Sequence, residues 1–333
     1  MRTGDALTST KIAGLLAVIA IALSACGGAS DDETADTSAA NDLSAAYGAQ
    51  VASYDVAAAG PQRFLVGLIG TDGGTIVGGE VTLDFTYFGA DPGEASPTEE
   101  PAIDDVTASF VPVAGGTAPP AGEGPRLRTG DEGVGVYEAT EVRFDEPGFW
   151  GVTVHATIND VDVEFDAAFE VSAEHQIVKA GDPAPRTVNL LPGAPGAPAT
   201  AVDSRAEDDG TVPDPELHRL TVADAIATGR PTLIVVSTPV FCVSRFCGPI
   251  TDSVQALADE FGDQANFVHI EVWKDFEGNV LNASAAEWIY PEEGVGAAEP
   301  WVFLIDGSGT VVQRWDNVAN QAAVGAAVAE LVG

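Results

Sequence analysis

Basic residues, cysteine and methionine are scarce in this chain. Lys and Arg together number 14 in 333 residues, against 51 Asp and Glu, and the formal net charge is -37 at pH 7. A surface this acidic repels nucleic acid and anionic lipid headgroups, so the charge argues against both as partners. The acidic residues are spread over both halves of the chain. We interpret them as a surface adapted to high salt rather than as a specific cation-binding site.

Only three cysteines are present, and the first of them ends an N-terminal apolar run. The run from Ile12 to Leu23 is too short to span a bilayer as a helix and is typical of a signal peptide. The Leu-Ser-Ala-Cys sequence that ends at Cys26 resembles the bacterial lipobox, in which the cysteine is diacylated and becomes the new N-terminus. We therefore expect a signal peptide over residues 1–25 and a lipid anchor on Cys26, which would place the protein on the extracytoplasmic face of the cell membrane. The alternative is a plain signal peptide that leaves Cys26 free.

Two segments have the composition of linkers. Residues 26–45 are rich in Asp, Ala, Thr and Ser, and such a segment cannot bury enough apolar surface to order itself. It is predicted to be a flexible acidic tether. Residues 174–215 are rich in proline among Ala, Gly and Asp, which predicts an extended, semi-rigid linker.

Residues 46–173 alternate apolar and polar residues in short runs, for example in Glu80–Tyr87. This alternation predicts strands with one buried face, and breaks such as Asn159-Asp160 predict hairpin turns. About six or seven such strands without a helical period predict an antiparallel β-sandwich. The segments Gly135–Ala139 and Pro147–Val152 resemble immunoglobulin-like modules of bacterial envelope proteins, in which a G-x-Y strand precedes a G-x-W strand. Neither a metal site nor a catalytic group is expected here, because the region has no His, Met or Cys cluster.

Residues 216–333 change to alternating strands and helices. Thr232–Ser237 is a continuous apolar strand of the kind that is buried on both faces of a parallel sheet. Cys242 and Cys247 follow this strand directly. A pair so close in sequence, in an oxidising compartment, indicates a disulfide, a redox couple or a metal site.

Residues 216–333 resemble the thioredoxin family in three local features. Phe241-Cys242 after the apolar strand matches the aromatic-Cys step of the family. Gly294–Ile305 resembles the family's loop and strand with a cis-proline, and Pro300 would be that proline. A hairpin at Asp306–Gly309 and a closing amphipathic helix lie at the expected distances. The expected fold class is therefore two domains, an all-β immunoglobulin-like sandwich followed by an α/β thioredoxin-like fold.

The spacing of the two cysteines departs from the family motif, which is C-x-x-C. In one register Cys242 and Cys247 stand for the two family cysteines, with two residues inserted between them. In the other, Cys247-Gly248-Pro249-Ile250 overlays Cys-Gly-Pro-Cys, Ile250 replaces the second cysteine, and Cys242 supplies its partner from the preceding loop. The first register keeps the aromatic-Cys step and is preferred. In both registers the sulfurs lie near a helix N-terminus, which stabilises a thiolate.

Other features of the family's site also differ. The buried strand acid that assists proton transfer in many thioredoxins would fall near Val236 and is absent. Glu299, beside the expected cis-proline, puts a negative charge near the sulfurs, which should raise the thiol pKa unless Arg245 offsets it. His269 could face the site, although a lone His is more often a packed or surface residue.

The resemblance implies thiol–disulfide exchange with a protein or small-thiol partner, carried by Cys242, Cys247 and Pro300, as in a thiol–disulfide oxidoreductase. Cys242 is expected to be the more exposed, attacking sulfur and Cys247 the buried, resolving one. Two alternatives stay open. One is a redox-silent envelope-binding or scaffold protein with a structural disulfide, and the other is a copper-handling thioredoxin-fold protein. No cofactor and no metal site are predicted, and the lipid on Cys26 is the expected contact with the membrane.

Overall fold

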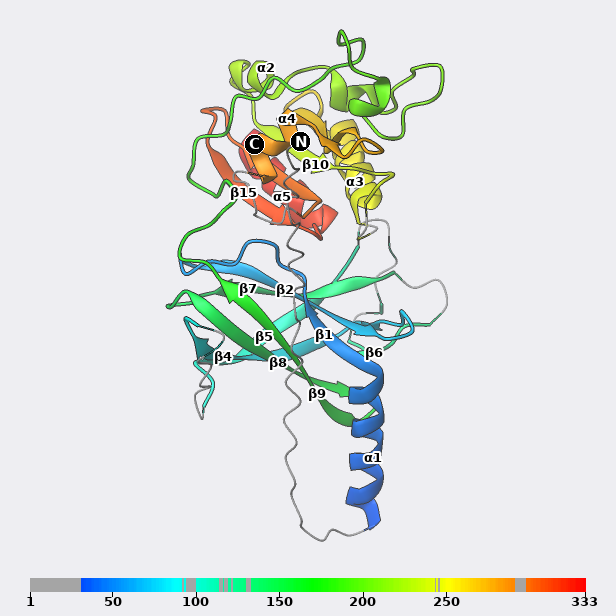
Figure 1. Cartoon of the computed structure of the whole chain (residues 1–333), viewed down its shortest axis with the longest axis vertical. Helices are drawn as coiled ribbons and strands as arrows, with labels where there is room; N and C mark the ends of the chain where they lie inside the picture. The colour runs from blue at the N-terminus through cyan, green and yellow to red at the C-terminus, as the bar shows by residue number, and fades with distance from the viewer. Residues whose placement is uncertain are drawn as a thin grey trace, which may run out of the picture.

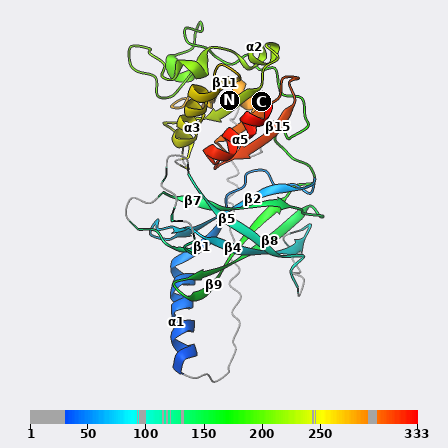
Figure 2. The ribbon, with the colours of Figure 1, turned by 180° about the vertical axis from the view of Figure 1, so that it is seen from behind.

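The computed structural model describes residues 31–333 except 92, 94–99, 114–115, 117–118, 121, 130–132, 243, 245 and 291–297, and for 31–38 it describes the backbone alone. The expected signal peptide and the lipid site at Cys26 lie outside the described residues. Two bodies are stacked on each other, as Figures 1 and 2 show from opposite sides. We call them the large-sheet body (residues 47–171) and the small-sheet body (residues 172–333).

A helix, α1 (Asp31–Ala46), leads into the large-sheet body. Ala40 and Leu43 of this helix pack against the apolar core of the sheet, and the helix lies beside β1 (Tyr47–Val51) and β9 (Val161–Val171). The structure thus has a helix over most of the segment that the sequence predicts to be a flexible tether. The apolar partners of this helix come from the sheet, and they cannot be seen in the local composition.

The large sheet consists of seven strands joined in antiparallel pairs, in the order β1-β2-β7-β5-β4-β8-β9. Besides β1 and β9 these are β2 (Gln62–Gly70), β4 (Glu80–Gly89), β5 (Ile103–Pro112), β7 (Gly135–Val142) and β8 (Gly148–Ile158). The short strands β3 (Ile76–Val77) and β6 (Arg126–Leu127) pair with each other. The two edge strands, β1 and β9, lie close together, so the sheet is nearly closed and resembles a barrel.

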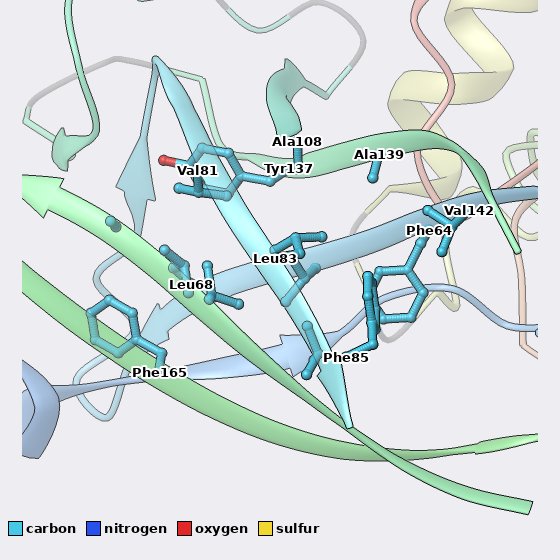
Figure 3. Close-up of a cluster of buried hydrophobic side chains, with 14 of the residues drawn as sticks. Phe64, Leu68, Val81, Leu83, Phe85, Ala108, Tyr137, Ala139, Val142 and Phe165 are labelled. Carbon is cyan, nitrogen blue, oxygen red and sulfur yellow. The ribbon is translucent and has the colours of Figure 1, made fainter. Parts of the chain in front are cut away.

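Alternating side chains fill the interior of this sheet. In β4, Val81, Leu83 and Phe85 are buried while the residues between them are more exposed, and Figure 3 shows them among the aromatic side chains of neighbouring strands. The hairpin predicted at Asn159-Asp160 is confirmed. Both residues have positive φ, 52° and 66°, which suits a two-residue turn between β8 and β9.

The expected fold class is wrong. Strand outweighs helix by 37% to 21%, and the first body is one nearly closed, barrel-like sheet, so the chain does not fit an immunoglobulin-like sandwich followed by an α/β thioredoxin-like fold. Alternation determines which face of a strand is buried, but it does not determine which strands become neighbours. A sandwich and a closed sheet therefore leave the same pattern in the sequence.

The small-sheet body holds a four-stranded sheet in the order β11-β10-β14-β15. These strands are β10 (Thr232–Ser237), β11 (Asn266–Glu271), β14 (Trp301–Ile305) and β15 (Val311–Asp316). β10 and β11 are parallel, whereas β14 is antiparallel to both of its neighbours. A short hairpin of β12 (Trp273–Asp275) and β13 (Val280–Leu281) follows β11.

Helices cover both faces of the small sheet. Leu233 and Val235 of β10 face a core shared with α3 (Cys247–Phe261) and α5 (Gln321–Val332). Ile234 and Val236 face the other core, with α2 (Val222–Ala227) and α4 (Ala283–Ile289). Every residue of β10 is buried, which makes it a central strand and explains its continuous apolar sequence.

The segment predicted to be a linker, residues 174–215, packs against the small sheet. Gly181 N–H donates to the carbonyl of Val311 at 2.8 Å, and Val311 N–H donates to the carbonyl of Asp182 at 2.9 Å, so this segment lies along the outer edge of β15. The 3₁₀ helix η2 (Ala199–Ala201) follows, and a second one, η3 (Pro215–His218), lies against β11 at the opposite edge.

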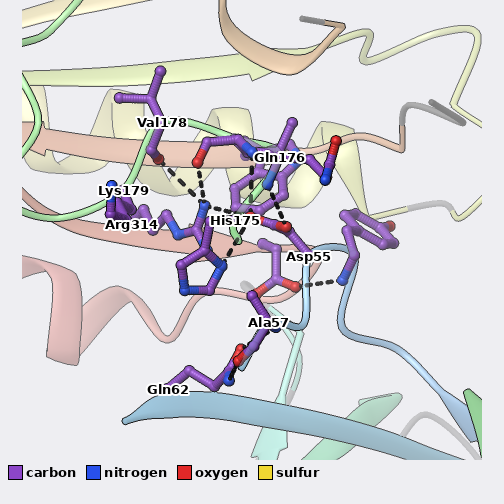
Figure 4. A network of polar contacts seen from close by, with 12 residues as sticks. Asp55, Ala57, Gln62, His175, Gln176, Val178, Lys179 and Arg314 are labelled. Atoms are coloured by element: carbon purple, nitrogen blue, oxygen red, sulfur yellow. Dashed lines mark hydrogen bonds and ion pairs between the residues drawn. The ribbon is translucent and has the colours of Figure 1, made fainter. Parts of the chain in front are cut away.

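Polar side chains join the two bodies. Asp55 accepts hydrogen bonds from Gln176 N–H at 2.9 Å and from the Arg314 guanidinium at 2.7 Å, and its Oδ2 lies 3.2 Å from Nδ1 of His175 (Figure 4). We call Asp55, His175 and Arg314 the Asp55 cluster. Arg63 of β2 makes a second link, because it contacts Asp316 of β15 at 3.1 Å.

Candidate functional site

The disulfide between Cys242 and Cys247 lies between β10 and α3. β10 ends at Ser237, Cys242 lies in the loop that follows, and Cys247 is the first residue of α3. The two Cα atoms are 6.0 Å apart, an ordinary separation for a disulfide. The structure therefore brings both of the predicted sulfurs into one bond.

The two cysteines differ in exposure. Cys247 is fully buried, whereas Cys242 is partly exposed, as the sequence analysis expects. The hydroxyl oxygen of Ser244 lies 3.2 Å from Sγ of Cys242, close enough to donate to a thiolate there. A partner would therefore reach the disulfide through Cys242.

Cys247 lies at the positive end of a helix. α3 has 15 residues, and the N–H groups of its first two residues, Cys247 and Gly248, have no carbonyl partner inside the helix. Pro249 has no N–H, and Ile250 N–H donates to the carbonyl of Phe246 at 3.0 Å. The Thr251 hydroxyl donates to the carbonyl of Cys247 at 2.8 Å and lies 2.7 Å from Oγ of Ser237, which fixes the start of α3 to the end of β10. A thiolate on Cys247 would be stabilised by the free N–H groups and by the helix dipole.

The peptide bond between Glu299 and Pro300 is cis, which confirms the conformation expected for Pro300. A carboxylate oxygen of Glu299 lies within 4.8 Å of both sulfurs. Burial raises the pKa of Glu299, and the nearby charge of Glu271 raises it further. A charged carboxylate at this position would oppose a thiolate on either sulfur.

Glu271, at the end of β11, is a buried acid that the sequence analysis missed. It pairs in register with Ser237, is only 1% exposed, and accepts a hydrogen bond from Ser204 N–H at 2.8 Å. Burial raises its pKa. The sequence analysis looked for the acid only in β10, where Val236 occupies the expected position. The sequence feature that could have revealed Glu271 is its place at the end of the neighbouring apolar strand. Parallel strands end at the same edge of a sheet, so such a residue lies beside the end of β10.

The large-sheet body also contributes to this site. The Tyr54 hydroxyl donates to the carbonyl of Glu299 at 3.1 Å. Phe246, just before Cys247, packs against a buried cluster formed by Leu65, Val113 and Val136 of the large-sheet body and Val318 of the small-sheet body. The large-sheet body therefore covers one side of the disulfide loop, a role that its strand pattern did not indicate.

Exposed aromatic side chains lie next to Cys242. Phe241 stacks on Phe276 with ring centroids 4.1 Å apart and planes 3° from parallel, and Trp273 packs edge-on against Phe276 at 5.4 Å. Val240 and Phe276 are 55% and 44% exposed. This apolar surface gives a partner area to contact beside the accessible sulfur.

Two other residues singled out by the sequence do not join the sulfurs in the described contacts. Nε2 of His269 lies 3.2 Å from the carbonyl of Ser237, and its ring faces Asp203 and His218. Arg245 lies outside the described residues. Cys242, Cys247 and Glu299 could together hold a soft metal ion only after reduction, because thiolates and not disulfide sulfurs are the metal ligands.

Two comparisons with known proteins give no relative from which a function of this site could be inferred. No helix in the described ranges is both long and apolar enough to cross a bilayer. A scan against known protein families finds none that matches the chain. A search of curated proteins likewise finds no relative of significant similarity.

Proposed function

We propose that this chain exchanges thiols and disulfides with a protein or small-thiol partner through Cys242 and Cys247. The observation that carries the proposal is the asymmetry of the disulfide. One sulfur is accessible in a loop, and the other is buried at a helix N-terminus that stabilises a thiolate. Exchange needs one sulfur that a partner can reach and one that can leave and return.

In the oxidised protein, a partner thiolate attacks Sγ of Cys242. The Cys242–Cys247 bond breaks, a mixed disulfide forms between the partner and Cys242, and Cys247 leaves as a thiolate. A second partner thiolate then displaces Cys242, so the partner is oxidised to a disulfide and the cysteine pair is reduced by two electrons. In the opposite direction, the Cys242 thiolate attacks a partner disulfide and Cys247 resolves the mixed disulfide.

A purely structural disulfide is the competing explanation. A ring closed over so few residues restricts the unfolded chain only modestly, by about 2 kcal/mol. The bond also connects a loop at the end of a central strand to a helix start that Thr251 and Ser237 already hold. A structural role therefore explains little of the position of the disulfide, whereas thiol–disulfide exchange explains why its two sulfurs differ in exposure.

The decisive measurement is the reduction potential of the Cys242–Cys247 couple in the full chain. A value between about -270 and -120 mV supports exchange, and a value well below about -300 mV indicates a structural disulfide. Cys247→Ser should trap a mixed disulfide through Cys242, and Cys242→Ser is the matched control that should trap little. Trapping by Cys242→Ser instead would reverse the roles, and no trapping by either variant would leave the structural disulfide.

We further propose that the chain acts on the extracytoplasmic face of the membrane, anchored through a diacylated Cys26. The lipobox-like sequence supports this location, and an oxidising compartment suits a working disulfide. Cys26→Ala should release the protein from membranes or leave an unprocessed precursor in detergent partitioning. Identical partitioning of the two forms would contradict the anchor without affecting the redox proposal.

A further inference from the structure

A second group of metal-ligating side chains lies in the small-sheet body. Asp203, His218 and His269 each bring one ligand atom within 4.8 Å of the others, and their side chains are completely buried. Asp203 follows η2, His218 ends η3, and His269 lies in β11. We call these three residues together with Arg205 the Asp203 cluster.

Several imidazole nitrogens in this cluster are buried and have no hydrogen-bond partner among the described residues. They are both nitrogens of His218 and Nδ1 of His269. The other nitrogen of His269, Nε2, lies 3.2 Å from the carbonyl of Ser237, which can only accept, so Nε2 carries the hydrogen. In the neutral ring Nδ1 then presents a lone pair toward the Asp203 carboxylate. Either a proton on Nδ1 or a metal ion between the two atoms relieves the repulsion in that arrangement.

The separations fit a bound ion better than they fit hydrogen bonds. Oδ2 of Asp203 lies 3.4 Å from Nε2 of His218 and 3.4 Å from Nδ1 of His269. Hydrogen bonds from nitrogen to oxygen usually measure about 2.7–3.2 Å. Two ligand atoms, each about 2.0–2.1 Å from a tetrahedral zinc ion, lie about 3.3 Å apart. Both distances therefore match an edge of a zinc coordination tetrahedron.

The residues around two of the three side chains, His269 and Asp203, support the same interpretation, whereas Nδ1 of His218 has no hydrogen-bond partner among the described residues. Ligating histidines usually donate their other N–H to a carbonyl or carboxylate, and ligating carboxylates are themselves hydrogen-bonded. His269 makes the first kind of contact with Ser237, and Asp203 makes the second by accepting from Arg205 at 2.7 Å and 3.0 Å. Arg205 is shared with Asp214 at 2.7 Å and with Asp252 at 3.1 Å. Three carboxylates and one guanidinium therefore leave this group negative when both imidazoles are neutral.

We propose that Asp203, His218 and His269 bind one divalent transition-metal ion of the zinc class in a buried structural site. Two imidazole nitrogens and one carboxylate are ligands that zinc accepts without any thiolate. The ion would tie the irregular segment that precedes α2 to the central sheet. This site is separate from the disulfide, and the proposal does not rest on thiol exchange.

The test uses the full chain with its disulfide intact, refolded with Zn²⁺ or Co²⁺ because the site is buried. The expected result is one ion per chain by elemental analysis, and for Co²⁺ a visible spectrum of tetrahedral coordination without thiolate charge-transfer bands. His218→Gln and His269→Gln should each lower the affinity for Zn²⁺ by at least ~10- to 100-fold.

Two controls separate this site from others. His155→Gln changes an exposed histidine that lies 2.9 Å from Asp84 and 3.4 Å from Glu164, and it should leave the binding of Zn²⁺ unchanged. The double variant Cys242→Ser/Cys247→Ser should also bind one ion. A folded wild-type chain that takes up neither ion overturns the proposal, and so does a cobalt spectrum with thiolate bands. Because both outcomes are read from the wild-type chain, the test holds even if a histidine variant fails to fold.

Discussion

The Asp55 cluster and the Asp203 cluster contain the same residue types in different states. Each has a buried aspartate held by an arginine, with imidazole within 3.5 Å of the carboxylate. In the Asp55 cluster, Nδ1 of His175 lies 2.8 Å from Arg314, and each fully buried side-chain nitrogen or oxygen of the three residues has a partner among the described residues. In the Asp203 cluster, three imidazole nitrogens have none. A closed ion-pair network and a proposed metal site can therefore have the same composition.

The two clusters also connect different parts of the molecule. The Asp55 cluster joins the large-sheet body to β15 of the small sheet, whereas the Asp203 cluster joins an irregular segment to β11 within one body. Disrupting the Asp55 cluster should weaken the contact between the two bodies. Disrupting the Asp203 cluster should weaken only the attachment of the irregular segment to β11. The following predictions separate these effects.

The largest effect is expected for Asp55→Ala, which leaves Arg314 and His175 without their carboxylate. Breaking a buried ion pair by removing one partner costs about 3–5 kcal/mol, and the free energy of unfolding in urea should fall by that amount. Glu138→Ala is the matched control, because Arg63 loses one carboxylate but keeps Asp316. An equal loss in the two variants would show that the Asp55 cluster has no special part in joining the bodies.

Zinc should stabilise the chain through the Asp203 cluster only. At a free zinc concentration of about 100 times Kd, the free energy of unfolding should rise by about 2.7 kcal/mol. Thermal unfolding with and without a chelator measures this change. His175→Gln should respond to zinc like the wild type and His218→Gln should not, so an equal response of the two variants would remove the proposed difference between the clusters.

The Asp55 cluster should also make the free energy of unfolding fall at low pH. Burial alone would raise the pKa of Asp55, but the His175 hydrogen bond and the Arg314 charge bring it down to about 2, from an ordinary value of 3.8. A carboxyl with a lowered folded-state pKa adds stability above its ordinary value and loses it as pH falls through the folded value. This contribution is about 2 kcal/mol, present above pH 3.8 and lost toward pH 2. Urea unfolding between pH 6 and pH 2 should show the loss in the wild type and a flatter curve in Asp55→Asn.

The smallest effect is expected at Glu299, a half-buried carboxyl for which the described contacts include no cation. Burial and the charge of Glu271 raise the pKa of Glu299 above the ordinary 4.5. The contribution of this carboxyl to stability is therefore fully present below pH 4.5 and is lost as pH rises through the pKa of the folded state. Glu299→Gln should therefore be more stable than the wild type at neutral pH and equal to it below pH 4.5. A difference that does not change with pH would mean that the effect of the substitution is not electrostatic.

Local structure could be predicted well from the sequence because local patterns carry it. The strand Thr232–Ser237, the turn at Asn159-Asp160 and the cis peptide before Pro300 all lie where the sequence places them. The closure of the large sheet could not be predicted, because contact between β1 and β9 joins residues more than a hundred positions apart. No local pattern encodes that pairing.

The candidate sites also differ in whether their residues lie close together in the sequence. Cys242 and Cys247 could be found because both lie in one short segment after a recognisable strand. Asp203 lies in a segment whose proline content predicts a linker, and His218 and His269 each appear alone in the sequence. Their proximity depends on the packing of three separate segments around β11, and composition does not reveal that packing. Tyr54 was missed for the same reason, because its partner Glu299 belongs to the other body.

The edge strands of both main sheets are covered from within the chain, and this affects how copies of the protein meet. β1 and β9 lie together beneath α1, residues 181–184 lie along β15, and η3 lies against β11. An uncovered edge strand offers unpaired N–H and C=O groups to which another chain can add a strand, the first step of edge-to-edge aggregation. With these edges covered, copies of the protein would not join through strand addition, and contacts between them would have to form between side chains.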